Sequence, residues 1–165
     1  MTTLEALRSE FEHETATLRK HLARVPEDKL DWRPHPKSFT ARELASHLVE
    51  CVGWTESIFG RDELAMDPAT FEPFVATSTP ALLAAYDGKV EAGRRALSAA
   101  TPADLDQPWR LKIRDRVRFE RPRSVVFRDF TLSHLIHHRG QLSVYLRLLD
   151  VPVPGSYGPT ADEKA

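Results

Sequence analysis

Apolar residues recur at three- and four-residue steps in four long stretches of the chain, the spacing that is typical of amphipathic helices. The first stretch begins at Leu4 and ends before Pro26, where the chain must leave helical geometry. The second begins at Thr40, where Glu43 completes a capping box, and runs to about Gly60. Their stripes consist of Leu4, Leu7, Phe11, Leu18 and Leu22, and of Leu44, His47, Leu48, Cys51, Trp54 and Ile58.

The third stretch follows a loop with Pro68, Pro73 and Pro80, and the fourth follows residues 109–119. Thr79 and Pro80 are typical of a helix cap followed by a first-turn proline, and this helix stops before Thr101. The last helix begins near Ser124 and ends before the proline-rich tail at 151–159. Its stripe consists of Val126, Phe127, Phe130, His134, His138, Leu142, Tyr145 and Leu149.

Residues 109–119 follow a different period, because apolar and basic residues alternate there. This pattern predicts a short extended or hairpin segment. The whole pattern favours an all-α fold, an antiparallel four-helix bundle with a short hairpin segment before the last helix. We expect a single domain over residues 1–165, a length that supports one hydrophobic core.

The composition of the chain indicates which partners and which cellular compartment to expect. The 23 Lys and Arg residues balance 24 Asp and Glu residues, so nothing in the charge predicts a nucleic-acid partner. Cys51 is the only cysteine, which excludes an internal disulfide and suits a reducing compartment. The N-terminus is interrupted by charges and no apolar run is long enough for a bilayer, so we expect a cytoplasmic protein with no membrane partner.

Three histidines occupy positions where the stripes require apolar residues. His134 and His138 lie four residues apart, which places their Cβ atoms about 5–6 Å from each other on one helical face. Two imidazoles at this spacing can bind one ion. His47 has the same kind of position on the second helix, whereas His137 points elsewhere. The spacing therefore predicts a metal site of His47, His134 and His138 with one position open to water or substrate.

The alternative is a polar network without a metal, because an inward histidine often has only a hydrogen-bonding role. For several residues close to these histidines, the sequence allows either a role at the site or ordinary packing. These are Gln141 and Tyr145, one and two turns beyond His138, Cys51, one turn beyond His47, and His137. Arg139 faces away from the three histidines, and we expect it to form an ion pair with a neighbouring helix or subunit. The arginines between 110 and 128 could bind carboxylates, but a solvated hairpin face explains them more simply.

The run His134-Leu-Ile-His-His-Arg-Gly-Gln141, with the later Pro152-Val-Pro-Gly-Ser-Tyr-Gly-Pro159, resembles the DinB/YfiT-like family of metalloenzymes. The segment from Thr40 to His47 is similar to that family's second helix. This resemblance implies a four-helix bundle with a long crossover, often dimeric. It also implies that His47, His134 and His138 are the metal ligands, with zinc or nickel as the ion.

Two functions follow from these observations. The resemblance implies a metal-dependent thiol S-transferase or related detoxification enzyme, which would act on a low-molecular-weight thiol and an electrophile. The open coordination position would suit a thiol sulfur. The alternative is a non-catalytic metal-binding or interaction module in which the ion ties the helices together.

Overall fold

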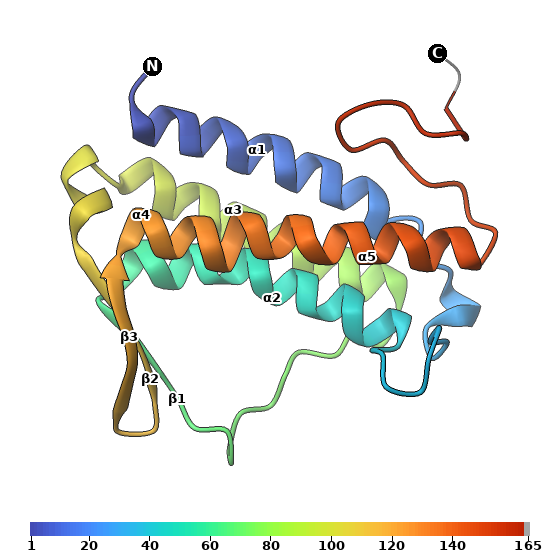
Figure 1. The fold of residues 1–165 in the computed structure, drawn as a ribbon, viewed down its shortest axis with the longest axis horizontal. Coiled ribbons are helices and arrows are strands. Elements are labelled where there is room, and N and C mark those ends of the chain that lie inside the picture. Colours follow the sequence, from blue (N-terminus) through green and yellow to red (C-terminus); the bar gives the residue numbers. More distant parts are fainter. Residues whose placement is uncertain (164–165) are drawn as a thin grey trace.

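The computed structural model describes residues 1–163, and most of them are helical (Figure 1). Five α-helices are α1 (Thr3–Leu22), α2 (Ala41–Gly60), α3 (Thr79–Ala99), α4 (Arg123–Val126) and α5 (His134–Leu148). A π-helical segment, Phe127–Ser133, joins α4 to α5, so the last helix is continuous. Short 3₁₀ turns occupy Glu27–Lys29 and Pro102–Asp106.

The four long helices form the bundle that the sequence predicts. Helix α1 packs against α3 and α5, and α2 packs against the same two. Helices α1 and α5 run in one direction, whereas α2 and α3 run in the other (Figure 1). Because α2 and α3 are parallel, residues 61–78 must return along the bundle between them. This segment is the crossover, and it lies beside α2.

The helix starts have clear chemical causes. Thr40 accepts a hydrogen bond from the Glu43 backbone N–H at 3.1 Å, and Glu43 accepts one from the Thr40 N–H at 2.7 Å. This reciprocal pair is the predicted capping box, and it fixes where α2 begins and therefore where His47 lies. The predicted cap of α3 is wrong by one residue. Ser78 caps the helix and Thr79 is already helical, because the Ser78 hydroxyl accepts from the Ala81 N–H at 3.1 Å.

A purely all-α fold is an incomplete description, because the chain also forms a three-stranded sheet. The predicted hairpin is β2 (Pro108–Ile113) with antiparallel β3 (Arg116–Pro122). The sequence did not predict β1 (Glu63–Met66), which pairs parallel to β2 within the crossover. Trp109 anchors the sheet to the bundle, since its indole N–H donates to the Ser57 carbonyl of α2 at 3.1 Å.

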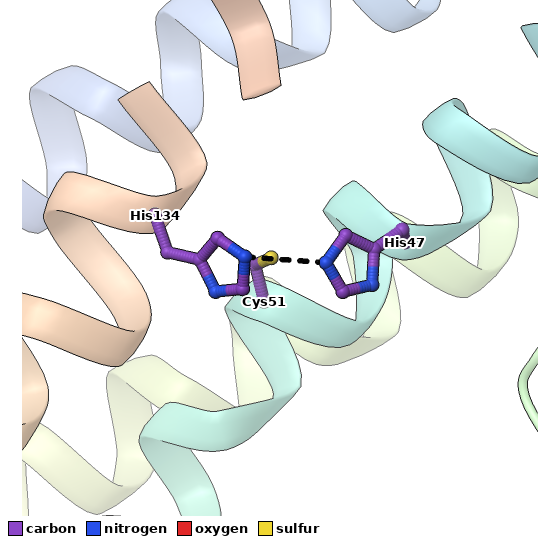
Figure 2. A group of neighbouring side chains, drawn as sticks. All are labelled: His47, Cys51 and His134. Carbon is purple, nitrogen blue, oxygen red and sulfur yellow. Dashed lines mark hydrogen bonds between the residues drawn. The ribbon is translucent and has the colours of Figure 1, made fainter. Parts of the chain in front are cut away.

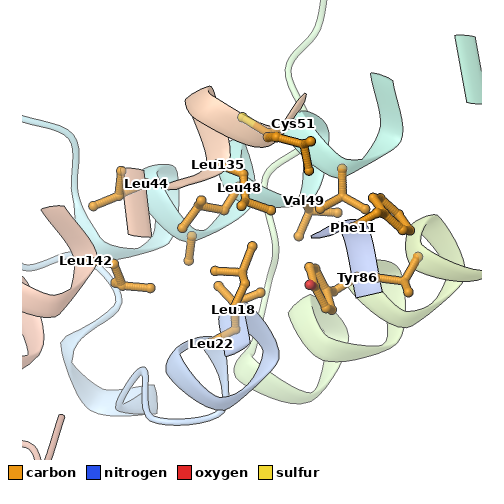
Figure 3. Packing of buried hydrophobic residues seen from close by; sticks show 14 of the residues in the cluster. Phe11, Leu18, Leu22, Leu44, Leu48, Val49, Cys51, Tyr86, Leu135 and Leu142 are labelled. Carbon is orange, nitrogen blue, oxygen red and sulfur yellow. The ribbon is translucent and has the colours of Figure 1, made fainter. Parts of the chain in front are cut away.

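The core lies between the helices and contains the predicted stripes (Figure 3). Side chains from α1, α2, α3 and α5 meet there, among them Phe11, Leu18, Leu48, Tyr86 and Leu135. Burial of these apolar groups is the main stabilising term. The same packing holds the facing sides of α2 and α5 at a fixed separation, and this positions the histidines.

Candidate metal centre

His47 projects from the middle of α2, and its orientation is set by Glu50. The His47 Nδ1 atom lies 3.1 Å from Glu50 Oε2. A carboxylate only accepts hydrogen bonds, so Nδ1 carries the proton and the Nε2 lone pair of the neutral ring is free. The other Glu50 oxygen accepts from the Phe74 backbone N–H at 2.9 Å. Glu50 thus links the His47 ring to the crossover.

His134 and His138 lie one turn apart on α5. The His138 Nδ1 atom is 2.7 Å from Gln141 Oε1, so Nδ1 carries the proton and donates a hydrogen bond to Gln141. The Nε2 atom of His138 is again free. The His134 ring forms a hydrogen bond with the backbone of Phe130, one turn earlier. Outer acceptors of this kind are common partners of metal-binding histidines because they fix the ring orientation.

The three rings converge between α2 and α5. Their centroids are 5.0 Å apart for His47 and His134, 4.8 Å for His47 and His138, and 4.7 Å for His134 and His138. The Nε2 atoms of His47 and His134 are 3.3 Å apart and face each other (Figure 2). If each of these two rings is neutral and carries its single proton on Nδ1, their Nε2 lone pairs point at each other. A proton or a metal cation between them removes this repulsion.

Cys51 lies behind this pair, one turn along α2 from His47 (Figure 2). Donor atoms of His47, Cys51 and His134 all lie within 4.8 Å of one another, and the cysteine is fully buried. Burial raises the pKa of the Cys51 thiol to about 12, and the charge of Glu50 contributes in the same direction. The thiol is therefore protonated at neutral pH unless a cation stabilises the thiolate.

The environment favours neutral imidazoles on α5. Burial lowers the pKa of His138 to about 4, although the Gln141 hydrogen bond opposes that shift. Burial also lowers the pKa of His134, and the neighbouring histidines His47 and His137 add to this effect. Neutral rings are the form that binds a metal, so both groups are ready to bind one at neutral pH.

The other predicted positions have different roles. His137 is exposed, and its ring centroid is 4.8 Å from that of His138. Gln141 contacts His138 directly, as described above. The Tyr145 hydroxyl donates its proton to the Phe39 carbonyl at 2.9 Å, so it is not available as a donor to a ligand. No local sequence pattern indicates the link from Glu50 to Phe74.

The arginines that the sequence singles out take part in ion pairs. Arg139 faces away from the histidines, as predicted, and its guanidinium lies 2.6 Å from the Glu14 carboxylate of α1. Both residues are almost fully buried. In the arginine-rich stretch, Arg110 pairs with Glu120 and Arg114 with Asp67, which fits a solvated hairpin face.

A pocket of about 460 Å³ opens beside His138. It lies between the loop that precedes α2 and the outer face of α5. Its lining consists of Lys37, Ser38, Phe39, His138, Gln141, Val144 and Tyr145. Among the three candidate ligands, only His138 is part of this lining.

Comparison with known families agrees with this architecture. The family model of the DinB superfamily matches residues 10–142. The chain belongs to the DinB superfamily. This DinB-superfamily protein is 27% identical over 166 residues to the uncharacterized protein YrdA of Bacillus subtilis (strain 168), and the alignment covers 99% of this chain and 93% of YrdA.

Solved structures of DinB-like proteins have the same fold. One from Bacillus cereus ATCC 10987 is 25% identical with a TM-score of 0.74, over 93% of this chain and 97% of the other. YjoA from Bacillus subtilis is 17% identical with a TM-score of 0.70, over 93% and 99% of the two chains. The second likeness supports the fold alone. Within residues 1–163, none of the helices combines the length and apolar character that a bilayer span requires.

Proposed function

We propose that this DinB-superfamily protein binds one divalent transition-metal ion through His47, His134 and His138 and uses it to activate a small-molecule thiol. The convergence of the three rings between α2 and α5 carries this proposal. The Nε2 atoms of His47 and His134 lie 3.3 Å apart. Metal–nitrogen bonds of about 2.0–2.1 Å place two ligands of a tetrahedral ion about 3.3–3.4 Å apart, so the spacing of these two nitrogens fits such an ion.

The chemistry of the donors also fits. Three neutral imidazoles suit zinc or nickel and do not choose between them. A bound divalent ion at such a site supplies an exchangeable coordination position and lowers the pKa of a thiol that occupies it. Glu50 and Gln141 hold the His47 and His138 rings, and the pocket beside His138 gives a substrate access. The reaction best suited to this arrangement is the transfer of a thiol sulfur to an electrophile, as catalysed by a thiol S-transferase.

The test is an assay of zinc- and nickel-loaded protein with a panel of thiols and electrophiles, followed as loss of free thiol. We expect metal-dependent turnover that His134→Ala abolishes and that His137→Ala, on the same helical turn, retains. Turnover that persists unchanged in His134→Ala would rule out this function. The homodimer implied by the sequence resemblance is a separate prediction, which sedimentation of the purified protein tests.

A second candidate is a non-catalytic module in which the ion only fastens α2 to α5. The position of Cys51 favours it, because a thiolate added to the three histidines would give a closed four-coordinate set. Cobalt(II) loading distinguishes the two candidates. A thiolate-to-cobalt charge-transfer band that disappears in Cys51→Ala supports the closed site, and its absence from the wild-type spectrum supports the open one.

A further inference from the structure

The pocket beside His138 has a one-sided charge. Lys37 contributes an ammonium group, and within residues 1–163 no Asp or Glu lines the pocket. Lys29 and Lys112 pair with carboxylates, whereas Lys37 has no carboxylate partner in this part of the chain. The lysine is therefore available to a ligand, and the ligand charge that it favours is negative.

The hydrogen-bonding groups of the pocket also favour an anion. Gln141 uses its carbonyl oxygen to accept from His138, which leaves its NH₂ group as a donor. Tyr145 uses its hydroxyl to donate to the Phe39 carbonyl. A ligand in this pocket thus meets the ammonium of Lys37 and the amide N–H groups of Gln141, which are complementary to the oxygens of a carboxylate.

The pocket lining also contains two exposed apolar side chains. Phe39, in the loop before α2, is 48% exposed, and Val144, on α5, is 56% exposed. Leu148, one turn beyond Val144, is 56% exposed as well. Covering these side chains with the hydrocarbon part of a ligand removes apolar surface from water. The pocket therefore suits a small organic molecule that combines an apolar body with an acidic group.

We propose that this pocket selects thiols that carry a carboxylate, with Lys37 binding the carboxylate while the sulfur is directed to the metal at His138. This inference rests on the proposed function, because the metal site determines which end of the ligand points inward. A substrate of this class is anchored at both ends. Lys37 is then a specificity-determining residue.

The experiment is calorimetric titration of zinc-loaded full-length protein with two thiols that differ only in the carboxylate, N-acetylcysteine and N-acetylcysteamine. We expect N-acetylcysteine to bind about tenfold more tightly, the effect of one charge-assisted hydrogen bond at a partly open site. Lys37→Gln should lose this preference. Lys20→Gln, which removes an exposed lysine from α1, should keep it.

Two further titrations distinguish a failure of the Lys37 proposal from a failure of the proposed metal–thiol function. N-acetylserine, which has the carboxylate but no sulfur, and chelator-treated protein both test the metal–thiol contact. If N-acetylcysteine binds no better than N-acetylserine, or equally well without zinc, the proposed function fails and this inference falls with it. If the thiol dependence and zinc dependence hold but Lys37→Gln retains the preference, only the role of Lys37 is overturned.

Discussion

His138 and Arg139 are neighbours on α5, yet each belongs to a polar cluster of a different kind. The Arg139 guanidinium donates to the Glu14 carboxylate at 2.6 Å and to the Tyr157 hydroxyl oxygen at 2.9 Å, and the Tyr157 hydroxyl in turn donates to Glu14 at 2.9 Å. Every charge in this cluster has a partner from the protein. In the histidine cluster, Nδ1 of His47 and Nδ1 of His138 each have a side-chain acceptor, and the Nε2 atoms of His47 and His134 face each other.

This difference separates a structural cluster from a candidate binding site. A buried ion pair is complete without any ligand, so its role is to hold α1, α5 and the C-terminal segment together. The three imidazole rings lie within 5.0 Å of one another, centroid to centroid, and the facing Nε2 atoms of His47 and His134 can bind a cation. The two clusters should therefore respond in opposite ways to mutation and to metal removal.

The largest expected effect comes from breaking the buried pair. Arg139→Met leaves the Glu14 carboxylate buried without its counter-charge, and we expect a loss of about 3–5 kcal/mol in the free energy of unfolding. Urea denaturation of the metal-free protein measures it. Arg19→Met is the matched control, because Arg19 also links α1 to another helix through Asp87 but at the surface. It should change stability very little, and an equal loss in both variants would contradict the distinction.

A smaller effect is expected from the acceptors that hold the rings. Glu50→Ala removes the partner of His47 Nδ1, and we expect zinc affinity to fall about 10–100-fold. Glu56→Ala, on the exposed side of the same helix, should leave zinc affinity unchanged. Competition with a chromophoric chelator measures both. Equal affinities for Glu50→Ala and wild type would show that the ring orientation does not depend on Glu50.

The smallest effect concerns pH. Burial lowers the pKa of His138 to about 4 in the folded protein, whereas an unfolded histidine titrates near pH 6.5. The unfolded chain therefore binds more protons between these values, and the stability of the metal-free protein falls as the pH drops from about 6.5 to about 4. His138→Gln should reduce this slope, measured as Tm against pH, while His137→Gln should preserve it. A slope unchanged in His138→Gln would contradict the assignment.

Much of the fold could be predicted from the periodicity of apolar residues and from capping residues. The stripes and the Thr40 capping box predicted the long helices closely, because these signals come from residues three or four apart. The strand β1 was missed because its four residues, Glu63–Met66, have no β-branched side chain and their partner strand lies more than 40 residues away. The π-helical segment Phe127–Ser133 was missed because one altered turn barely changes an apolar stripe.

In the candidate site, too, local patterns predicted some features and missed others that depend on distant contacts. The helical faces selected His47, His134 and His138, and the structure brings these three together. The contact between Glu50 and Phe74 depends on how the crossover returns to the bundle, which local patterns do not encode. The partner of Arg139 had a visible signal. Glu14 lies three residues after Phe11 and four before Leu18, so a charge there falls on the buried stripe.

The most direct test of the three-histidine site is the metal content of tag-free protein. Wild type, His134→Ala and His137→Ala are each incubated with excess zinc, desalted and analysed for zinc per chain. We expect one bound zinc ion per chain for wild type and for His137→Ala, and none for His134→Ala. Wild-type protein without stoichiometric zinc, or His134→Ala with the full amount, would contradict it.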